Sequence, residues 1–155
     1  AGRAGIPQLV APGCYDLVDL VGWQPLPEQF RGRPTHAHNR LLTSAVLTAG
    51  ERRAVAREIC AKLAGARAPV ALLLPLEGCN EWDRPGADLH DAEGLAAFCD
   101  AIRQDCPGNV TLHEIAAHIN DAAFCAAALA VFDEWLADGT IRAAPQGLAN
   151  RAKPE

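Results

Sequence analysis

The sequence predicts an α/β fold, a single domain built as a three-layer sandwich around a mostly parallel, Rossmann-like sheet. Residues 70–76 form a short apolar run without alternation, and strand and helix patterns alternate along the chain. Of the 155 residues, 50% are apolar, enough for the core of one domain. Alternating strands and helices are typical of a parallel sheet with right-handed crossovers. We expect residues 1–138 to form this domain and residues 139–155 an irregular tail.

The first part of the chain predicts short elements joined by turns. Residues 6–10 are apolar, and Pro7 suits the start of a strand. Pro12-Gly13 then marks a turn. Residues 17–22 are expected to form a short helical segment. Residues 23–34, which are rich in proline, are expected to form an irregular connection that is either a partner-binding arm or packed on the sheet.

An extended segment and a further strand come next. In residues 35–39, His36 and His38 are two positions apart, so their imidazoles share one face of an extended chain. Residues 41–47 are predicted as the second strand of the sheet. Residues 70–76 are predicted as its central strand, and residues 110–115 as a third strand that follows the next helix.

Three amphipathic helices are predicted from their caps and apolar stripes. Thr48 and Glu51 form a capping box, Asp91 caps the second helix, and Asn120 or Asp121 caps the third. The stripes are, in chain order, Val55, Ile59 and Leu63, then Leu95, Phe98 and Ile102, then Phe124, Ala128, Phe132 and Leu136.

Charge and cysteine usage exclude several classes of protein. The net charge is -5 and no Lys/Arg cluster is present, so we expect neither nucleic acid nor a membrane surface as a partner. The chain has no signal peptide and no initiator Met, which suggests a cytoplasmic fragment of a longer protein. None of the six cysteines forms a CxxC pair, as expected of reduced thiols. Cys60, Cys99 and Cys125 are expected to be buried in helices, whereas Cys14 and Cys79 in loops are the candidate reactive thiols.

Polar segments follow three of the predicted parallel strands. Residues 12–16, 77–83 and 118–121 should therefore meet at one edge of the sheet, where open α/β sheets bind ligands. His118 is the candidate general acid or base, and Asp83 would orient ligand hydroxyls or a metal-bound water. The candidate ligand-binding residues are Gly13, Asp16, His38, Asn39, Gly78, Asn80, Asn120 and Asp121. Plain turns and helix caps remain the alternative explanation for Gly13, Asn120 and Asp121.

Recognised cofactor and catalytic motifs are missing from the sequence. His36, His38 and several aspartates offer metal ligands, but their spacing matches no zinc signature, and we expect no tightly bound metal. No GxxxxGK[ST] or GxGxxG loop is present. Ser44, the single serine, lies within a predicted strand, which gives no support to a Ser-His-Asp triad.

Several short motifs together resemble the C-terminal half of an uncharacterised ATP-binding protein family that includes the tomato mosaic virus resistance protein. The resemblance covers residues 4–136. Its motifs are Ala4-Gly5-Ile6-Pro7-Gln8, Pro12-Gly13 with Asp16, His38-Asn39, Pro75-Leu76 with Gly78 and Asp83, and His118-Ile119-Asn120-Asp121 with Phe124. This chain has His38-Asn39-Arg40, Gly78-Cys79-Asn80 and Asn120-Asp121-Ala122 where relatives tend to have His-Asn-Pro, Gly-Val-Ser and Asn-Asp-Pro.

The resemblance implies a protein of two α/β subdomains, of which this chain is the second. It further implies a homodimer and association with ATP and Mg, with the nucleotide contacts largely in the N-terminal subdomain. Our leading hypothesis is the ligand-binding half of a cytoplasmic protein with an undefined enzymatic function and a small-molecule ligand. The alternatives are a non-catalytic binding or dimerisation module and a metal-dependent hydrolase.

Overall fold

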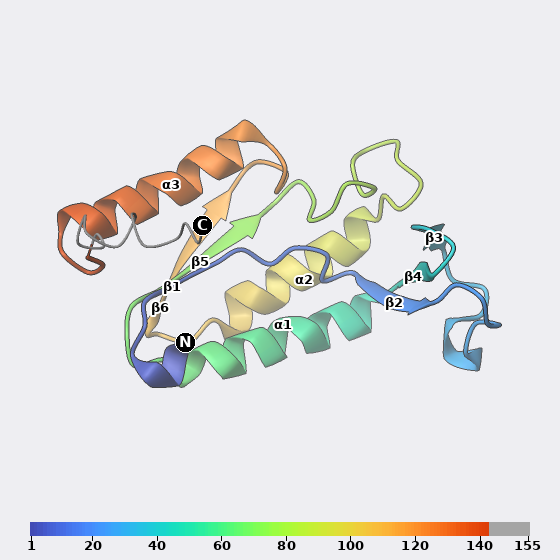
Figure 1. Ribbon diagram of the computed structural model, residues 1–155, viewed down its shortest axis with the longest axis horizontal. Coiled ribbons are helices and arrows are strands. Elements are labelled where there is room, and N and C mark those ends of the chain that lie inside the picture. The colour runs from blue at the N-terminus through green and yellow to red at the C-terminus, as the bar shows by residue number, and fades with distance from the viewer. Residues whose placement is uncertain (143–155) are drawn as a thin grey trace, which may run out of the picture.

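The computed structural model describes residues 1–142 and has the predicted α/β architecture (Figure 1). Its main sheet is parallel, in the order β1–β5–β6, formed by β1 (Gln8–Val10), β5 (Val70–Pro75) and β6 (Val110–Ile115). One face packs against α1 (Ala49–Ala64) and α2 (Ala92–Asp105), and the other against α3 (Ala122–Ala137). Most of the predicted tail, residues 143–155, lies outside the described residues.

Strand β5 is the central strand, as predicted, and all six of its residues are buried. Val70, Leu72 and Leu74 point into the core beneath α1 and α2, whereas Ala71 and Leu73 belong to the core beneath α3. A strand covered on both faces needs apolar side chains at every position. This explains why the run shows no alternation in the sequence.

A second, antiparallel sheet corrects two predictions. It has the order β2–β4–β3 and consists of β2 (Leu17–Val21), β4 (Leu42–Val46) and β3 (Thr35–Ala37). The segment predicted as helical, residues 17–22, therefore forms a strand over Leu17–Val21, and the strand predicted over residues 41–47 does not join the parallel sheet. Pairing explains the difference, because β2 matches β4 residue for residue from Leu17↔Val46 to Val21↔Leu42. Such long-range pairing overrides local propensity.

Part of the proline-rich connection between β2 and β3 packs against the rest of the protein. It contains a short 3-10 helix, Glu28–Phe30, in which Phe30 is only 7% exposed. The Arg33 guanidinium lies 4.9 Å from the centre of the Phe30 ring. Trp23, at the other end of the connection, is 62% exposed. Phe30 is thus a packing residue, and Trp23 alone of the two aromatic residues is free for a partner.

Helix α1 begins with the predicted capping box. The Thr48 hydroxyl accepts a hydrogen bond from the Glu51 backbone N–H at 3.3 Å, and the Glu51 carboxylate accepts one from the Thr48 N–H at 2.8 Å. Arg33 also pairs with Glu51, at 2.6 Å. The hydrogen bond from Arg33, followed by that from Thr48, lowers the pKa of Glu51 to about 2.

Glu51→Gln should lower stability at neutral pH but not in acid. The folded-state pKa of Glu51 lies below its ordinary value of 4.5, so this carboxylate stabilises the fold above about pH 4.5 and loses that effect towards pH 2. The group is partly exposed, so we expect a loss of no more than about 1 kcal/mol at pH 7. Urea unfolding across this pH range measures it. Glu58→Gln, on the exposed face of α1, is the control, and a pH-independent difference would contradict the expectation.

Helix α3 packs against the sheet through a different face from the one that its predicted apolar stripe defines. Phe124 and Val131 are buried against the sheet, whereas Phe132 and Leu136 are 44% and 38% exposed. The buried stripe also includes Ala128 and Trp135. Two neighbouring stripes of this helix are apolar, so periodicity could not select the correct one. Cys125, expected to be buried, is exposed on the same helix.

The predicted stripes of α1 and α2 do face the core. Leu63, Phe98 and Ile102 are buried, and Val55, Ile59 and Leu95 pack against them. Among the residues that the structure describes, no helix combines the length and the apolar character that a membrane crossing requires.

Candidate functional site

Loops that follow all three parallel strands meet at the carboxyl edge of the sheet, as expected. The Cys14 N–H, in the loop after β1, donates to the Cys79 carbonyl after β5 at 2.9 Å. The Ile119 N–H, in the loop after β6, donates to the Gly78 carbonyl at 3.1 Å. The loop after β5 is thus fixed through backbone hydrogen bonds to the loops after β1 and β6, which lie far from it in the sequence.

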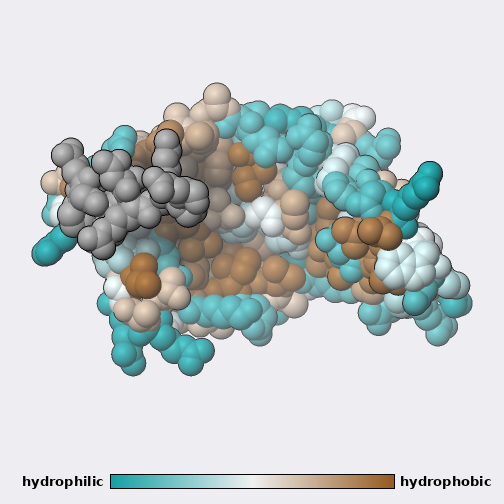
Figure 2. Space-filling view, viewed as in Figure 1, coloured by the Kyte–Doolittle hydropathy of each residue, from teal (hydrophilic) through white to brown (hydrophobic). Residues whose placement is uncertain are grey.

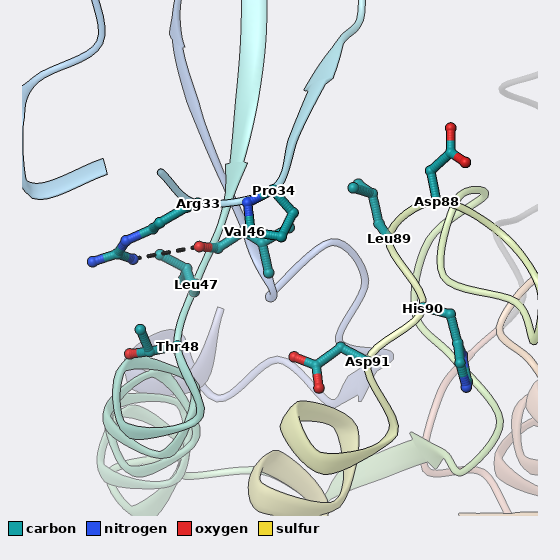
Figure 3. Close-up of a pocket in the computed structure, with 9 residues that line it drawn as sticks. All are labelled: Arg33, Pro34, Val46, Leu47, Thr48, Asp88, Leu89, His90 and Asp91. Carbon is teal, nitrogen blue, oxygen red and sulfur yellow. Dashed lines mark hydrogen bonds between the residues drawn. The ribbon is translucent and has the colours of Figure 1, made fainter. Parts of the chain in front are cut away.

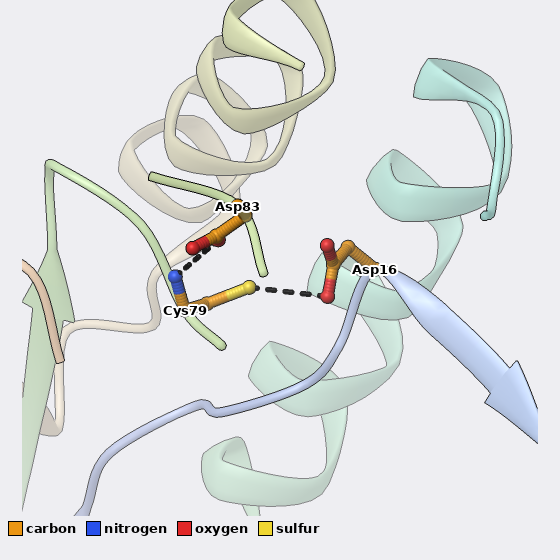
Figure 4. A group of neighbouring side chains, drawn as sticks. All are labelled: Asp16, Cys79 and Asp83. Atoms are coloured by element: carbon orange, nitrogen blue, oxygen red, sulfur yellow. Dashed lines mark hydrogen bonds between the residues drawn. The ribbon is translucent and has the colours of Figure 1, made fainter. Parts of the chain in front are cut away.

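A buried network centred on Asp16 lies beneath these loops. Asp16 is 1% exposed and accepts hydrogen bonds from the Asn80 side-chain amide, at 2.8 and 3.0 Å. The Cys79 thiol also donates to Asp16, with a sulfur–oxygen distance of 3.2 Å (Figure 4). Burial, reinforced by the negative charge of Asp16, raises the pKa of the Cys79 thiol far above its ordinary range. Cys79 is therefore a protonated hydrogen-bond donor and not the reactive thiol predicted as one possibility.

Asp83 and His118 form the second part of the network. The Asp83 carboxylate accepts from the Cys79 N–H at 2.6 Å and from His118 Nε2 at 2.9 Å. His118 Nε2 also lies 2.8 Å from the Asn80 carbonyl, and Nδ1 accepts from the Asn120 N–H at 3.1 Å. This pattern assigns the proton to Nε2. Both ring nitrogens are engaged and the residue is 1% exposed, so the geometry favours a positioning role for His118 over the predicted acid–base role.

The two glycines of the predicted site approach protein side chains. Gly78 has φ +133°, and a Cβ there would lie 2.5 Å from His118 Cδ2 and 2.6 Å from Asp83 Oδ1. A Cβ on Gly13 would lie 3.2 Å from the Ile119 side chain. We expected both glycines to let a ligand approach the backbone. Instead, Gly78 makes room for the His118–Asp83 pair, and Gly13 lies against a neighbouring loop.

Asn120 and Asp121 tie the loops together from the outside. The Asn120 amide donates to Glu81 at 2.9 Å. Asp121 accepts from Arg84 at 2.9 Å and from the His118 N–H at 3.0 Å. The hydrogen bond from Arg84 lowers the pKa of Asp121. Asp121 occupies the N-cap of α3 but makes no side-chain capping bond, so its role lies in joining loops.

Three side chains of the network could in principle hold a metal ion. Ligand atoms of Asp16, Cys79 and Asp83 all lie within 4.8 Å of one another. They are, however, already satisfied by hydrogen bonds within the network, and a metal would have to displace the thiol proton from Cys79. The donor set therefore gives a metal-dependent hydrolase little support.

A cleft of about 250 Å³ lies between the small antiparallel sheet and Trp82, whose backbone N–H donates to the Asn80 side chain at 2.8 Å. Its floor and walls are Cys14, Leu17, Asp19, His38, Leu42, Ser44 and Trp82. His36 stacks on Trp82 with ring centres 4.1 Å apart, and His38 meets the same indole edge-on at 5.7 Å. The extended segment thus contacts Trp82 in the loop after β5 from the antiparallel sheet. Asn39 does not line the cleft, because its side chain accepts from the Leu41 and Leu42 N–H groups in the β3–β4 turn.

The cleft has an acidic character. Burial first, and then the charges of Asp16, Asp19 and Asp83, raises the pKa of the Cys14 thiol at its wall. Cys14 is therefore protonated as well, which argues against its predicted role as a reactive thiol. Cys14 also adopts φ +50°, a conformation that residues other than glycine rarely adopt. The Ser44 hydroxyl donates to Asp19 at 2.6 Å, which holds one carboxylate oxygen in place.

Sequence reasoning missed three residues of this cleft. Asp19 was assigned to a helical segment, Ser44 was considered only as a nucleophile, and Trp82 was given no role. The antiparallel register places Asp19 directly opposite Ser44, a pairing visible only once residues 17–21 are recognised as a strand.

A second cavity of about 330 Å³ lies at the end of β4, between the start of α1 and residues 88–91 (Figure 3). It is lined by Arg33, Pro34, Val46, Leu47, Thr48, Asp88, Leu89, His90 and Asp91. Arg52, which is buried nearby, donates to the Leu47 carbonyl at 3.0 Å and to Asp91 at 2.8 Å. None of the predicted ligand-binding residues lines this cavity, so the first cleft is the candidate site.

Comparison with known proteins identifies related sequences. Residues 1–136 match the family model described as the C-terminal domain of uncharacterised protein family UPF0261. A UPF0261 protein of Brucella melitensis is 55% identical over 91% of this chain and 34% of its own length. A UPF0261 protein of Mesorhizobium japonicum is 32% identical over 84% of this chain and 34% of its own length. The tomato ToMV resistance protein Tm-1(GCR237) is 30% identical over 84% of this chain and 17% of its own length. The chain thus spans about a third of the length of these bacterial relatives.

Proposed function

We propose that this chain, which belongs to the UPF0261 family as its C-terminal domain, is the ligand-binding half of a longer protein with two subdomains. The ligand would be a small molecule in the cleft between the small antiparallel sheet and Trp82. The observation that carries the proposal is the position of this cleft. Two of its walls, Cys14 and Trp82, belong to the loops that follow β1 and β5 at the carboxyl edge of the parallel sheet, and their N–H groups donate to Cys79 and Asn80.

The network supports the proposal by making the wall of the cleft rigid. Asp16 and Asn80 join the loop after β1 to the loop after β5, and His118 joins the latter to the loop after β6. Rigid walls lower the ordering cost of binding. Asp16, Asn80 and His118 would therefore position the cleft, and side chains nearer its mouth would touch the ligand.

The lining of the cleft indicates what kind of ligand it would take. Asp19 offers a carboxylate oxygen, and Leu17, Leu42 and Trp82 offer apolar and aromatic surface. The negative charge around Cys14 opposes a bare phosphate. We infer a ligand with an apolar or ring-shaped part that presents hydrogen-bond donors or a positive charge to Asp19. An ATP molecule would require Mg and contacts from the N-terminal part of the protein.

Further parts of the proposal rest on the family. Association with ATP, a homodimeric state, an enzymatic activity and a cytoplasmic location are expectations for the whole protein. A non-catalytic docking module is the alternative, and the 62% exposure of both Trp23 and Leu41, which lie in the turns that follow β2 and precede β4, favours it.

Ligand-induced thermal stabilisation tests the proposal. The probes are ATP with Mg, sugar phosphates, neutral sugars and small amines, added to this chain alone and to a chimaera. In the chimaera, this chain replaces the matching third of the Brucella melitensis relative. A probe at about 100 times its dissociation constant should stabilise the fold by about 2.7 kcal/mol, which raises Tm by several degrees.

Asp19→Asn is the matched variant for this experiment. Asp19 is exposed, and the new side chain keeps an oxygen for Ser44, so the fold should remain intact. We expect it to abolish the ligand-induced shift, whereas Asp133→Asn on α3 should not. A shift in the chimaera only would support a cleft shared between subdomains. No shift for any probe in either protein would favour the docking module instead.

A further inference from the structure

Helix α3 carries an exposed apolar surface beside the stripe that packs on the sheet. Cys125, Leu129, Phe132 and Leu136 follow one another at helical spacing and form what we call the α3 stripe. Of the three large apolar side chains of the α3 stripe, Leu129 is the most exposed, at 55%. Single exposed apolar residues are ordinary on a protein surface. A continuous row over nearly the whole length of a helix indicates a partner.

Within residues 1–142, the sheet is also incompletely covered around this helix. Two helices pack on one face of the main sheet and α3 alone on the other, and β1 pairs only with β5 among the described strands. In the space-filling view, apolar side chains gather in the middle of the molecule, between the level of α3 and that of α1 (Figure 2). Ile6, next to β1, is likewise exposed. Apolar surface is thus left open along the sheet as well as on α3.

We infer that the α3 stripe is the docking surface for the part of the longer protein that precedes this chain. The relatives are about three times as long, and the family model matched here is a C-terminal domain, so a large preceding part exists in them. This inference concerns a surface away from the proposed ligand cleft and does not depend on what the cleft binds.

A second copy of this chain fits the stripe less well, for two reasons. Helix α3 contains Asp133 and Glu134 but no Lys or Arg, so two such helices packed together would bring like charges close. Three large side chains also fall short of the roughly 800 Å² per partner that stable complexes of separate chains bury. A covalently linked domain can dock through a smaller buried area, because the linkage sets an effective concentration in the mM range. The expected occupant therefore presents apolar side chains bordered by neutral or basic ones.

Alkylation of Cys125 tests the inference directly, because this thiol belongs to the stripe and is exposed in the chain alone. The reaction is followed by mass spectrometry in the isolated chain and in the Brucella melitensis chimaera described above. We expect Cys125 to react at least about tenfold more slowly in the chimaera, since the docked interface must open locally before the reagent can reach the thiol. Cys99, on the buried face of α2, should stay unreactive in both and reports that the fold is intact.

Substitutions in the stripe complete the test. Leu129→Glu with Phe132→Glu should restore fast alkylation of Cys125 in the chimaera and leave the Tm of the isolated chain nearly unchanged. Leu41→Glu, at a residue that is 62% exposed in the turn before β4, should leave the protection intact. Equal alkylation rates in chain and chimaera would overturn the inference. So would protection of Cys125 in the isolated chain that increases with protein concentration, which would assign the stripe to a second copy.

Discussion

Gly78→Ala is expected to lower the free energy of unfolding by about 4 kcal/mol, from backbone strain at a positive φ together with overpacking of a buried site. The φ of +133° is one that residues with a Cβ rarely adopt. The added methyl group would also meet His118 and Asp83, which are held in place by hydrogen bonds of their own. Neither neighbour is the free end of a flexible side chain, so the collision cannot be relieved without opening the network.

Gly86→Ala is the matched control for this prediction. Gly86 also has a positive φ, +86°, but a Cβ there would meet nothing within 4 Å. It should cost only the backbone strain, about 1 kcal/mol. Urea unfolding of the two variants separates the two contributions. Equal losses for both would mean that the close approach at Gly78 contributes nothing, and that the His118–Asp83 pair tolerates extra volume.

The central strand and the meeting of the three loops could be predicted because both follow from local patterns. An unbroken apolar run such as Leu72 to Leu74 is characteristic of a strand covered on both faces. Once that strand is parallel to its neighbours, the polar residues after each strand must share one edge. Asp16, Asn80 and His118 therefore meet as expected, although they are far apart in sequence.

The small sheet and the cleft above it could not be predicted because they depend on long-range pairing. Residues 17–21 become a strand only because β4 offers a complementary register, and Asp19 and Ser44 meet through that register. The choice of which face of α3 is buried also depends on long-range packing. Val131 and Phe132 are both suitable core residues, and the packing of the sheet selects Val131. Burial, together with the charge of Asp16, keeps the Cys79 thiol protonated, so that it is a donor to Asp16 and not a nucleophile.

The Asp83–His118 contact should show strong energetic coupling. Asp83→Ala and His118→Ala are each expected to lower the free energy of unfolding by about 3 kcal/mol, because each leaves buried polar groups without partners. The double variant should cost less than the sum of the two, with a coupling energy of about 2 kcal/mol. The exposed Arg103–Glu114 ion pair gives the control cycle, in which we expect a coupling of no more than about 1 kcal/mol.

His118→Gln distinguishes a positioning role from acid–base catalysis. Its amide can replace the Nε2–H donor that serves Asp83 and the Asn80 carbonyl, although it loses the Nδ1 acceptor used by the Asn120 N–H. We therefore expect His118→Gln to recover about half of the stability lost in His118→Ala. It should also keep the ligand-induced thermal shift in the cleft. Normal stability together with complete loss of that shift would contradict the positioning role, because it would mean that the imidazole itself contacts the ligand.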